Sequence, residues 1–508
     1  MASIKTSRKK IILVYPKMGM SGAMVQHMPL SIIYAAIEPI KAGFTVDLVD
    51  VRLNPDTWQR DIAAKITPDT ILLGMSVLTG TPIINALEIT RWAKKNFPDI
   101  KIVWGGPHAA FNGREIMDEP TVDFVVTGYG SMPLALLARW VASQEDAPAL
   151  GQIEGLLYRD NGQTIAVPPH NEFEFTDYKE IPYHLIEKDL DRYGQLDNKE
   201  RIFPMFSVMG CPYQCTFCSS PAQYKDMKKK YVPYTTRDVV DHIEYVIKKY
   251  GATYIYFIDD DSFVNLSRVE EIIDEIKHRK IVIRLGFRGA RISEIIKMSD
   301  AYLDKLAAAG TNILHIGAES GSQKILDLIK KDCTVDDIIS VNKNLARHPQ
   351  IKTAYNWIVG VPGETVEDLK KTRDLIRRLI KDNPNAIIFI PNKFRPLPGT
   401  KLYQLALDYG YARPRKLEDW AETEAEGNYR PPWYTDEQAK MIKMMQVTSY
   451  FIDHKIEKVD IGNSLRFKVV RVLAWLYSPL ATLRFRYGIT GLLIEYRIFH
   501  WFSAAFRL

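Results

Sequence analysis

The chain has 508 residues, of which 46% are hydrophobic and 25% are charged. These are ordinary globular values, and they exclude a disordered, collagen-like or low-complexity protein. The net charge of +6 is mild for this length, so we expect no nucleic-acid partner. Four cysteines are too few for a fold held together by a disulfide framework.

The first apolar run is not typical of an export signal. Residues 11–15 are apolar, but the run is too short for the core of a signal peptide and ends at Pro16. The sequence has no run of about 18 apolar residues, so no transmembrane helix is predicted. We therefore expect a cytoplasmic protein, in a reducing compartment that keeps thiols free to bind metal.

Strand-like and helix-like patterns alternate over residues 1–145, which predicts a first domain. The alternation favours an open parallel sheet of the Rossmann type with helices on both faces. The predicted strands are residues 11–15, 46–51, 70–75, 100–104 and 124–127, and the predicted helices include residues 29–42 and 82–97.

Small residues follow three of these strands. Ligands in such sheets bind at the carboxyl ends of the strands, and small residues let a large, flat ligand approach the backbone. The pattern predicts a ligand site along this edge. The residues are Ser76 and Thr79 after the third strand, Gly105 and Gly106 after the fourth, and Gly128 and Gly130 after the fifth.

Residues 146–200 are predicted to connect two domains. Asn161-Gly162 is the predicted turn of a hairpin, and residues 168–180 are polar and irregular.

The alternation returns over residues 201–410, which predicts a second domain. Six strand–helix repeats suggest a partial (β/α)6 barrel, because a full eightfold barrel needs about 250 residues. A doubly wound sheet is the alternative. The predicted strands are residues 202–208, 254–258, 282–287, 313–316, 353–359 and 386–390, and helices are predicted at 236–250, 265–278, 300–309 and 366–381.

Three cysteines stand close together after the first strand of the second domain. Cys211, Cys215 and Cys218 have the spacing C-x3-C-x2-C. Three thiolates on one short loop suit a cluster of soft iron ions and leave one iron without a protein ligand. An iron with an open position can bind and activate a small molecule, whereas a four-thiolate cluster is better suited to electron transfer.

Structural zinc is the alternative at this loop, and it requires a fourth ligand. Cys333 is the one other thiol, and His184 and His242 are candidates without the usual spacing. Cys333 itself is predicted to be a small packed residue. A chance grouping of cysteines without metal is the remaining alternative.

At these residues the chain resembles the radical S-adenosylmethionine (SAM) superfamily, whose signature is a three-cysteine loop with an aromatic residue, here Phe217, before the third cysteine. The resemblance implies a 4Fe–4S cluster held by the three cysteines, with an open iron that chelates SAM. One-electron reduction by an external flavodoxin- or ferredoxin-like donor then cleaves SAM to a 5′-deoxyadenosyl radical, which abstracts hydrogen from a substrate.

Shorter motifs of the same superfamily follow at later strand ends. Asp260 lies in the acidic turn after the second strand, where it is expected to bond the methionine ammonium group of SAM. The alternative is that Asp259–Asp261 cap the next helix. Glu319 and Ser320, after the fourth strand, are the implied contacts of the ribose or methionine part of SAM.

Two arginines follow the third strand of this domain. Arg288 and Arg291 are candidates for binding a carboxylate or a phosphate, and surface salt bridges are the alternative. Residues 360–364 and 395–400 resemble the turns after the fifth and sixth strands of the superfamily, although a Pro-Gly turn alone is common.

The first domain resembles the cobalamin-binding domain of the cobalamin-dependent radical SAM subfamily, through residues 28–31 and its three small-residue loops. A flavodoxin-like module that has lost its ligand is the alternative. The resemblance implies that cobalamin binds at Ser76, Thr79, Gly105, Gly106, Gly128 and Gly130.

Two features depart from that subfamily pattern. Tyr129 and Ser131 replace both acids of the usual Gly-Glu-Gly-Glu element. The Asp-x-His-x-x-Gly motif, which supplies a cobalt-ligating histidine in many cobalamin proteins, is absent. We therefore expect no lower axial ligand from that motif, and we expect His27 and His108 to be polar loop residues.

The two resemblances together imply a division of labour. The barrel generates a carbon radical, and methylcobalamin donates a methyl group to it, so the substrate lies between the domains. The leading hypothesis is C-methylation of an unactivated carbon of a hydrophobic small molecule. The alternative is radical oxidation or cyclisation of a tetrapyrrole or lipid, as in the anaerobic cyclase of magnesium-porphyrin metabolism. A non-catalytic iron–sulfur carrier or sensor is the hypothesis from another class.

Residues 411–508 differ in composition, and we predict a helical C-terminal domain. After Asp460, Glu495 is the one acidic residue, while arginines and aromatic residues are interleaved. Such segments can lie in a membrane interface, which predicts peripheral contact with the inner face of the membrane. The alternative is a helical cap that packs over the barrel.

Overall fold

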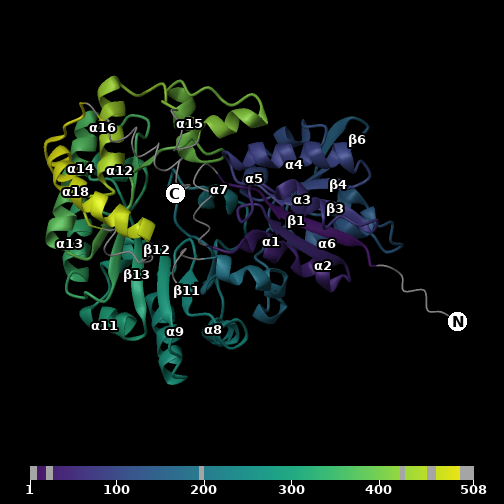
Figure 1. Ribbon diagram of the computed structural model, residues 1–508, viewed down its shortest axis with the longest axis horizontal. Helices are drawn as coiled ribbons and strands as arrows, with labels where there is room; N and C mark the ends of the chain where they lie inside the picture. Colours follow the sequence, from purple (N-terminus) through teal and green to yellow (C-terminus); the bar gives the residue numbers. More distant parts are fainter. Residues whose placement is uncertain are drawn as a thin grey trace.

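Two parallel sheets with their covering helices lie side by side in the computed structural model (Figure 1). The structure describes residues 8–18, 27–193, 200–423, 429–454, 465–491 and 493. The first sheet and its helices are drawn in purple to blue, and the second in teal to green. The α/β fold class expected from the sequence is therefore confirmed.

The first sheet has the strand order β2-β1-β3-β4-β5-β6-β7. The five strands β1 to β5 are parallel. Ile11 of β1 packs into one apolar core and the next residue, Ile12, into the other, so both faces of the sheet are buried. The strands are β1 (Lys10–Tyr15), β2 (Thr45–Asp50), β3 (Thr70–Ser76), β4 (Lys101–Gly105) and β5 (Phe124–Val126).

Six helices cover the two faces of this sheet. The core on one face includes residues of α1, α2 and α6, and the core on the other includes residues of α3, α4 and α5. The helices are α1 (Leu30–Ala35), α2 (Ile37–Lys41), α3 (Trp58–Ala63), α4 (Pro82–Asn96), α5 (Pro107–Met117) and α6 (Ser131–Val141).

The predicted hairpin exists, but it does not belong to a free connector. Strands β6 (Leu156–Asp160) and β7 (Gln163–Ala166) are antiparallel, and Asn161 and Gly162 between them both have positive φ, 47° and 79°. Strand β6 also pairs with β5, so the hairpin completes the first sheet. This pairing satisfies the backbone groups of β5, which would otherwise form an open edge.

The second sheet is a partial barrel of parallel strands in chain order, β8-β11-β12-β13-β14-β15, with β16 (Asn392–Lys393) beside β14. A doubly wound sheet would reverse its strand order at a switch point, so that alternative is wrong. The strands are β8 (Ile202–Met205), β11 (Tyr254–Phe257), β12 (Arg284–Arg291), β13 (Thr311–Glu319), β14 (Lys352–Val359) and β15 (Ala386–Ile388).

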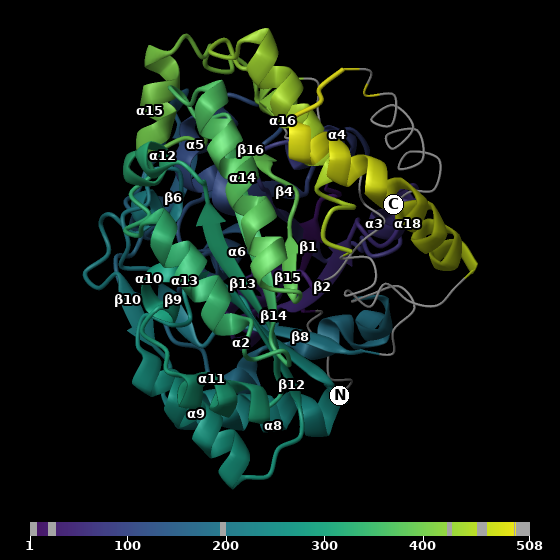
Figure 2. The same ribbon diagram turned by 90° about the vertical axis from the view of Figure 1, so that its left-hand side faces the viewer.

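Helices line the outer side of this barrel (Figure 2). Helix α8 (Thr236–Tyr250) has the bounds that the sequence predicts, because Thr235 caps its first turn and Gly251 ends it in the left-handed conformation. The others are α9 (Leu266–His278), α10 (Ile292–Ile295), α11 (Asp300–Ala308), α12 (Gln323–Leu328), α13 (Val335–Leu345) and α14 (Val366–Asp382).

The acidic turn after β11 does not cap a helix. Helix α9 begins at Leu266, and the side chain of Asn265 accepts a hydrogen bond from Arg268 N. The helix-cap alternative for Asp259–Asp261 is therefore wrong, because the chain makes a further turn between those acids and the helix.

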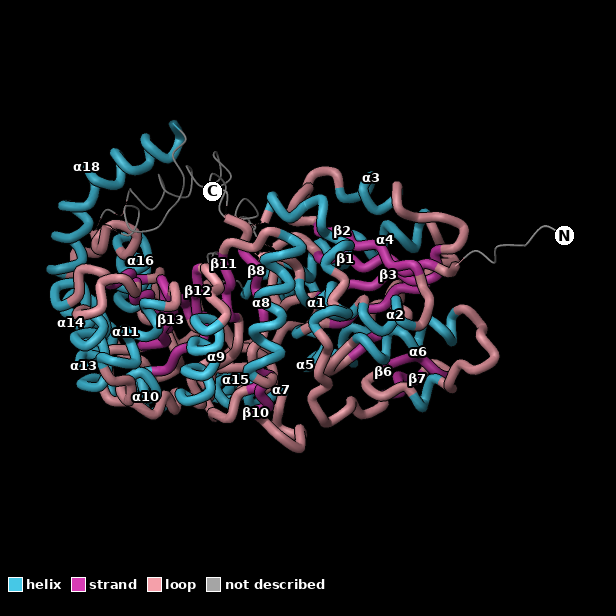
Figure 3. Tube along the Cα trace, turned by 90° about the horizontal axis from the view of Figure 1, so that it is seen from below, coloured by secondary structure: helices cyan, strands magenta, loops and turns pink. Residues whose placement is uncertain are grey.

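The C-terminal region is divided between the two sheets. Helices α16 (Asp436–Thr448) and α18 (Leu465–Tyr487) pack on each other and on α14, and Figure 3 shows α18 at the outer edge of the barrel. The short helix η4 (Leu417–Thr423) instead reaches the first domain, where Trp420 is buried and donates to Glu115 at 2.8 Å. Helix α15 (Lys401–Asp408) precedes it.

Within the ranges that the structure describes, none of the helices has the length and apolar character needed to cross a bilayer. The part of the basic, aromatic segment that follows residue 493, for which the sequence predicts membrane contact, lies outside these ranges.

Candidate active site at the cysteine loop

The cysteine loop begins directly after β9 (Val208–Gly210), which pairs with β10 (Tyr231–Pro233). Thr216, between the second and third cysteines, anchors the loop. Its backbone N–H donates to Ile329 O at 3.1 Å, its hydroxyl donates to Leu328 O at 3.0 Å, and its carbonyl accepts from Leu402 N at 3.0 Å. The loop is therefore held from the end of α12 and the start of α15.

All three sulfur atoms have N–H donors, and the backbone of Tyr213 supplies the donor to Cys211. Arg291 donates to Cys215 Sγ at 2.9 Å, and the backbone of Ser220 donates to Cys218 Sγ at 3.4 Å. Burial raises the pKa of the Cys211 thiol to about 12 and also raises the pKa of Cys218. These thiols need a positive partner, such as a metal, to be anionic at neutral pH.

A buried ion pair lies behind Cys215. Lys331 Nζ and Glu319 Oε1 are 2.9 Å apart, and both side chains are more than nine-tenths buried. Arg291 lies in the same region, donates to Lys331 O at 2.6 Å and stacks 3.9 Å over the ring of Tyr213. Two cations therefore stand beside the cysteine loop, where they favour an anionic group.

Glu319 adopts a strained backbone conformation, with φ of 63°. Gly317 leaves room for the ion pair, since a Cβ at that position would collide with Lys331 Nζ and Glu319 Oε1. Backbone strain in a non-glycine residue costs about 1–2 kcal/mol and persists where the surrounding contacts require it.

Three consecutive acids follow β11, and they do different things. Asp259 is buried and accepts from the backbone and hydroxyl of Ser207, so it holds the start of the cysteine loop. Asp261 is buried, and desolvation raises its pKa to about 8. Asp260 is exposed, lies near Cys211 and Cys218, and accepts from Ser220 Oγ at 3.0 Å. Asp260 is the acid of this turn that a ligand can reach.

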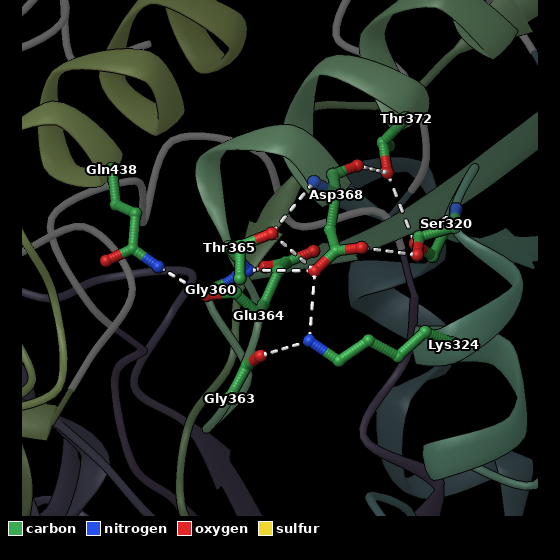
Figure 4. A network of polar contacts seen from close by, with 10 residues as sticks. Ser320, Lys324, Gly360, Gly363, Glu364, Thr365, Asp368, Thr372 and Gln438 are labelled. Atoms are coloured by element: carbon green, nitrogen blue, oxygen red, sulfur yellow. Dashed lines mark hydrogen bonds and ion pairs between the residues drawn. The ribbon is translucent and has the colours of Figure 1, made fainter.

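Ser320 lies in a buried network that fastens the turn after β13 to α14 (Figure 4). Its hydroxyl is 3.2 Å from Thr372 Oγ1. Asp368 accepts from Ser322 Oγ at 2.7 Å and from Thr365 Oγ1 at 2.7 Å, and it pairs with Lys324 at 3.3 Å. The hydroxyl of Ser320 therefore already has a protein partner.

Phe217, the aromatic residue before the third cysteine, is partly buried and packs against the main core.

The predicted loops of the first domain lie together at one edge of its sheet. Val77 N donates to Gly105 O at 2.9 Å, which joins the loop after β3 to the end of β4. Gly106 has φ of 92°, and a Cβ there would lie 2.7 Å from Val77 N and 2.8 Å from Ser76 Oγ. Glycine at position 106 is therefore needed for the close approach of the loop after β3, apart from any space that it leaves for a ligand.

The two glycines after β5 differ in exposure. Gly128 is exposed and has φ of 74°. Gly130 is partly buried, and a Cβ added there would lie 3.8 Å from its nearest neighbouring atom, which is an ordinary contact distance. The hydroxyl of Thr79 is 3.1 Å from His108 Nδ1.

Neither histidine of this domain projects freely from the edge. His108 is buried, its ring lies 5.5 Å from that of Trp420, and burial lowers its pKa to about 4. His27 is stacked on Tyr256 of β11, with ring centroids 5.0 Å apart. Both rings are packed. His27 precedes α1 in a loop, as expected, but His108 lies in the first turn of α5 and is buried, so the expectation of a loop residue is wrong for His108.

Loops from the two sheets meet at the cysteine loop. Tyr129, after β5, packs 5.7 Å from Phe173, which in turn packs 5.4 Å from Tyr224 beside the cysteines. Burial raises the pKa of Tyr129, with a further contribution from the charge of Asp260. The carboxyl ends of both sheets therefore face a common region, with a neutral aromatic residue where the sequence pattern leads one to expect an acid.

Residues 205–376 match the radical SAM superfamily, and residues 22–138 match the B12 binding domain. This chain is a radical SAM enzyme with a B12-binding domain. It is 28% identical over 387 residues to an uncharacterized methyltransferase of Pyrococcus horikoshii, over 75% of this chain and 78% of that one. It is 27% identical over 400 residues to the anaerobic magnesium-protoporphyrin IX monomethyl ester cyclase of Rubrivivax gelatinosus, over 76% and 69% of the two chains.

The radical SAM enzyme also shares its fold with a solved structure, that of the cobalamin-dependent S-adenosylmethionine radical enzyme OxsB with aqua-cobalamin bound. The TM-score is 0.71 at 14% identity, and the match covers 99% of this chain and 75% of that chain. The radical SAM domain implies SAM and a 4Fe–4S cluster, and the B12-binding domain implies cobalamin, so the expected family and cofactors are confirmed.

The donor set of the radical SAM enzyme is three thiolates on one short loop, which suits a cluster of soft iron ions. In the described parts of the chain, no three His, Cys, Asp or Glu side chains are arranged around one metal position. A cubane cluster does not need such convergence, because each thiolate binds a different iron. The zinc alternative gains no ligand from Cys333, which packs against the core, or from His242, whose Nε2 is 3.1 Å from the Tyr183 hydroxyl.

The edge of the B12-binding domain is also chemically suited to its cofactor. Its hydroxyl and backbone groups are neutral, as are the amide side chains of the corrin ring, so hydrogen bonds form without desolvating a charge.

Sequence reasoning missed two parts of the site. Arg291 was expected to meet an anionic ligand or to form a surface salt bridge, but it is buried against Cys215. Lys331 carries no motif of its own, and its distance of twelve residues from Glu319 gives no signal of contact. The one sign of this contact in the sequence is that Lys331 follows shortly after the motif residue Glu319 and belongs to no apolar helix or strand pattern.

Proposed function

We propose that this enzyme C-methylates an unactivated carbon of a hydrophobic small molecule bound between its two domains. The observation that carries the proposal is the meeting of the loop after β5 with the loop after β11, where Tyr129 approaches Asp260. When bound, SAM and the cluster supply one-electron hydrogen abstraction, and cobalamin supplies a methyl group. A substrate must reach both, so it must lie where the loops meet.

We propose the following roles for the chain's own residues. Cys211, Cys215 and Cys218 hold the cluster, and Arg291 stabilises it by donating to Cys215 Sγ. Asp260 orients the methionine ammonium group of SAM, since its carboxylate is exposed beside the loop.

Two further SAM contacts are proposed with different roles. The ion pair with Lys331 holds the carboxylate of Glu319 in place, so Glu319 would contact SAM from a fixed position. The hydroxyl of Ser320 is already 3.2 Å from Thr372 Oγ1, so Ser320 would help SAM to bind by fixing the backbone of the turn after β13. Phe217 supports the third cysteine from the core side.

Cobalamin is proposed to lie along the edge of the first sheet. Its contacts would be neutral hydroxyl and backbone groups, and no histidine of the domain is proposed as a cobalt ligand. These residues are Ser76, Thr79, Gly105, Gly106, Gly128 and Gly130.

The second candidate is radical oxidation or ring closure without methyl transfer, and the similarity to the cyclase of Rubrivivax gelatinosus favours it. Incubation of the reconstituted enzyme with methyl-labelled SAM, reductant and candidate substrates separates the two. Methylation predicts that label is retained in the product. A product that is oxidised and unlabelled assigns the second candidate instead.

We further propose an external one-electron donor of the flavodoxin or ferredoxin type. Formation of 5′-deoxyadenosine from SAM on adding such a donor tests this step. A protein that binds the cluster and never forms 5′-deoxyadenosine would be a carrier or sensor rather than an enzyme.

Contact with an anionic membrane surface is proposed through α18. Its exposed face carries an apolar stripe with helical spacing, and the helix contains basic residues and no acid, which suits interfacial binding. Co-sedimentation with vesicles containing phosphatidylglycerol tests this, with L476E/L480E as the disrupting variant. Equal binding by both proteins would remove the proposal. The exposed apolar residues of the helix are Val469, Val472, Leu473, Trp475, Leu476, Leu480, Leu483 and Tyr487.

A further inference from the structure

Four side chains line one part of the inner wall of the barrel. On β12, Phe287 packs in the outer core, and the strand is irregular between Phe287 and Ala290. Arg288 lies in this irregular part, and its charge acts on His27, Tyr256 and His315, which places it on the inner face. Tyr256 of β11 and His315 of β13 flank it, with ring centroids 5.6 Å apart. His27 of the first domain closes the group, since its ring is stacked on Tyr256 at an interplanar angle of 7°.

Arg288 has no partner in the described part of the chain. Its side chain is exposed, and it makes no hydrogen bond or ion pair with any described residue. Its neighbours on the same strand differ: Arg284 pairs with Glu200, and Arg291 with Asp332 at 3.2 Å. A guanidinium group presents planar donors that match a carboxylate or phosphate, and here those donors are free.

The surroundings of Arg288 are neutral and aromatic. Burial, together with the charges of Arg288 and Arg52, lowers the pKa of His27 to about 4. Burial and the charge of Arg288 also lower the pKa of His315 to about 4, and Phe389 stacks on its ring at 5.3 Å. At neutral pH both imidazoles are uncharged. Arg288 then carries a full positive charge at this wall, and the other arginine that acts on His27, Arg52, is already paired with Asp50 at 2.6 Å.

We propose that this wall is a substrate subsite in which Arg288 binds an anionic group, a carboxylate or a phosphate, while the aromatic rings of His27, Tyr256 and His315 hold an apolar or aromatic body. The inference rests on the proposed function and deepens it, because it assigns the substrate class as an amphipathic acid. Arg288 is a specificity-determining residue.

The location of the subsite agrees with that role. Arg288 lies three residues before Arg291, whose side chain contacts Cys215, so an anion held by Arg288 lies in the neighbourhood of the cysteine loop. His27 comes from the B12-binding side and Tyr256 from the barrel, so a ligand here also contacts both domains. A site between two domains, lined by rings with one charged group, is typical for small-molecule ligands.

The first test compares an aromatic acid with its neutral counterpart on the reconstituted full-length protein. The probes are 1-naphthoate and 1-naphthamide, and binding is followed by naphthalene fluorescence. We expect naphthoate to bind about tenfold or more tightly than naphthamide. Arg288→Gln should reduce this preference to within about twofold, and Arg288→Lys should retain part of it.

Arg284→Gln is the matched control, because it removes an arginine from the same strand and the same face that already has a partner. It should leave the preference for naphthoate unchanged. Equal affinity of the wild-type protein for the two probes would overturn the proposal, as would an undiminished preference in the Arg288→Gln protein. Near-UV circular dichroism verifies that the variants are folded.

A second measurement identifies which acid the subsite serves, since SAM also carries a carboxylate. SAM binding is read from the change in the electron paramagnetic resonance spectrum of the reduced cluster. If the site serves the substrate, Arg288→Gln leaves this change intact, and naphthoate binds in the presence of saturating SAM. Loss of the change, or displacement of naphthoate by SAM, would assign the anion to SAM and overturn the substrate assignment.

The fluorescence assay does not depend on turnover, so this inference and the proposed function can fail separately. Failure to form 5′-deoxyadenosine with normal naphthoate selectivity would contradict the function alone. Formation of 5′-deoxyadenosine without that selectivity would contradict the subsite alone.

Discussion

The edges of the two sheets use opposite chemistry at positions that are equivalent in their folds. The edge of the barrel gathers charge, with Arg291 and Lys331 beside the cysteines and a buried carboxylate at Glu319. The edge of the first sheet is neutral, with glycines and hydroxyl groups around Gly106. The difference shows that an anionic cluster needs cations beside it. A corrin with neutral amide side chains instead needs space and protein hydrogen-bonding groups that are not already used within the protein.

The largest effect expected is loss of the cluster. Replacing Cys211, Cys215 or Cys218 by Ala should reduce bound iron and sulfide and abolish 5′-deoxyadenosine formation, because each thiolate binds a different iron. Cys333→Ala is the control and should retain both. Full iron content in any of the three variants would contradict the assignment of the cluster to the charged edge of the barrel.

Next in size is the cost of an unpaired buried charge. Lys331→Met leaves Glu319 without its partner and should lower the free energy of unfolding by about 3–5 kcal/mol. Lys324→Met is matched to it, because Lys324 pairs with Asp368 but is 57% exposed, and it should cost about 1 kcal/mol or less. Urea denaturation of both proteins measures the difference, and similar losses would show that burial is not what matters here.

On the neutral edge, Gly106→Ala should destabilise the protein by about 2–4 kcal/mol, since it adds a collision to an unfavourable positive φ. Gly43→Ala isolates the backbone cost, because Gly43 has φ of 89° and no atom lies within 4 Å of its Cβ position. The Gly106 variant should also bind aquacobalamin more weakly, as followed by absorbance. If both variants lose the same stability, the close approach of Val77 contributes nothing.

The smallest effect concerns acid stability at the turn after β13. Hydrogen bonds from Ser322 and Thr365 outweigh desolvation and lower the pKa of Asp368 to about 2. The group therefore contributes stability that is present above pH about 4 and is lost as the pH falls towards 2. Asp368→Asn should cost about 1–2 kcal/mol at pH 7 and remove that acid dependence. Parallel urea curves at pH 7 and pH 3 test this, and an unchanged pH slope in the variant would contradict it.

The sequence determined the local structure because local interactions decide it. The period of apolar residues located the strands and helices of both domains, capping residues set the ends of α8, and C-x3-C-x2-C placed three thiols on one loop whatever the fold around them. The Asn161-Gly162 turn was equally readable, because two successive residues must adopt positive φ.

Only the tertiary structure decided which distant residues meet. The pairing of β6 with β5, the passage of Trp420 into the first domain, and the contacts of Arg291 with Cys215 and Lys331 with Glu319 leave no local trace in the sequence. That Arg288 has no partner among the described residues is likewise visible only once its neighbours are in place. Long-range contacts of this kind depend on how whole elements pack, and many different residues could satisfy the same local pattern.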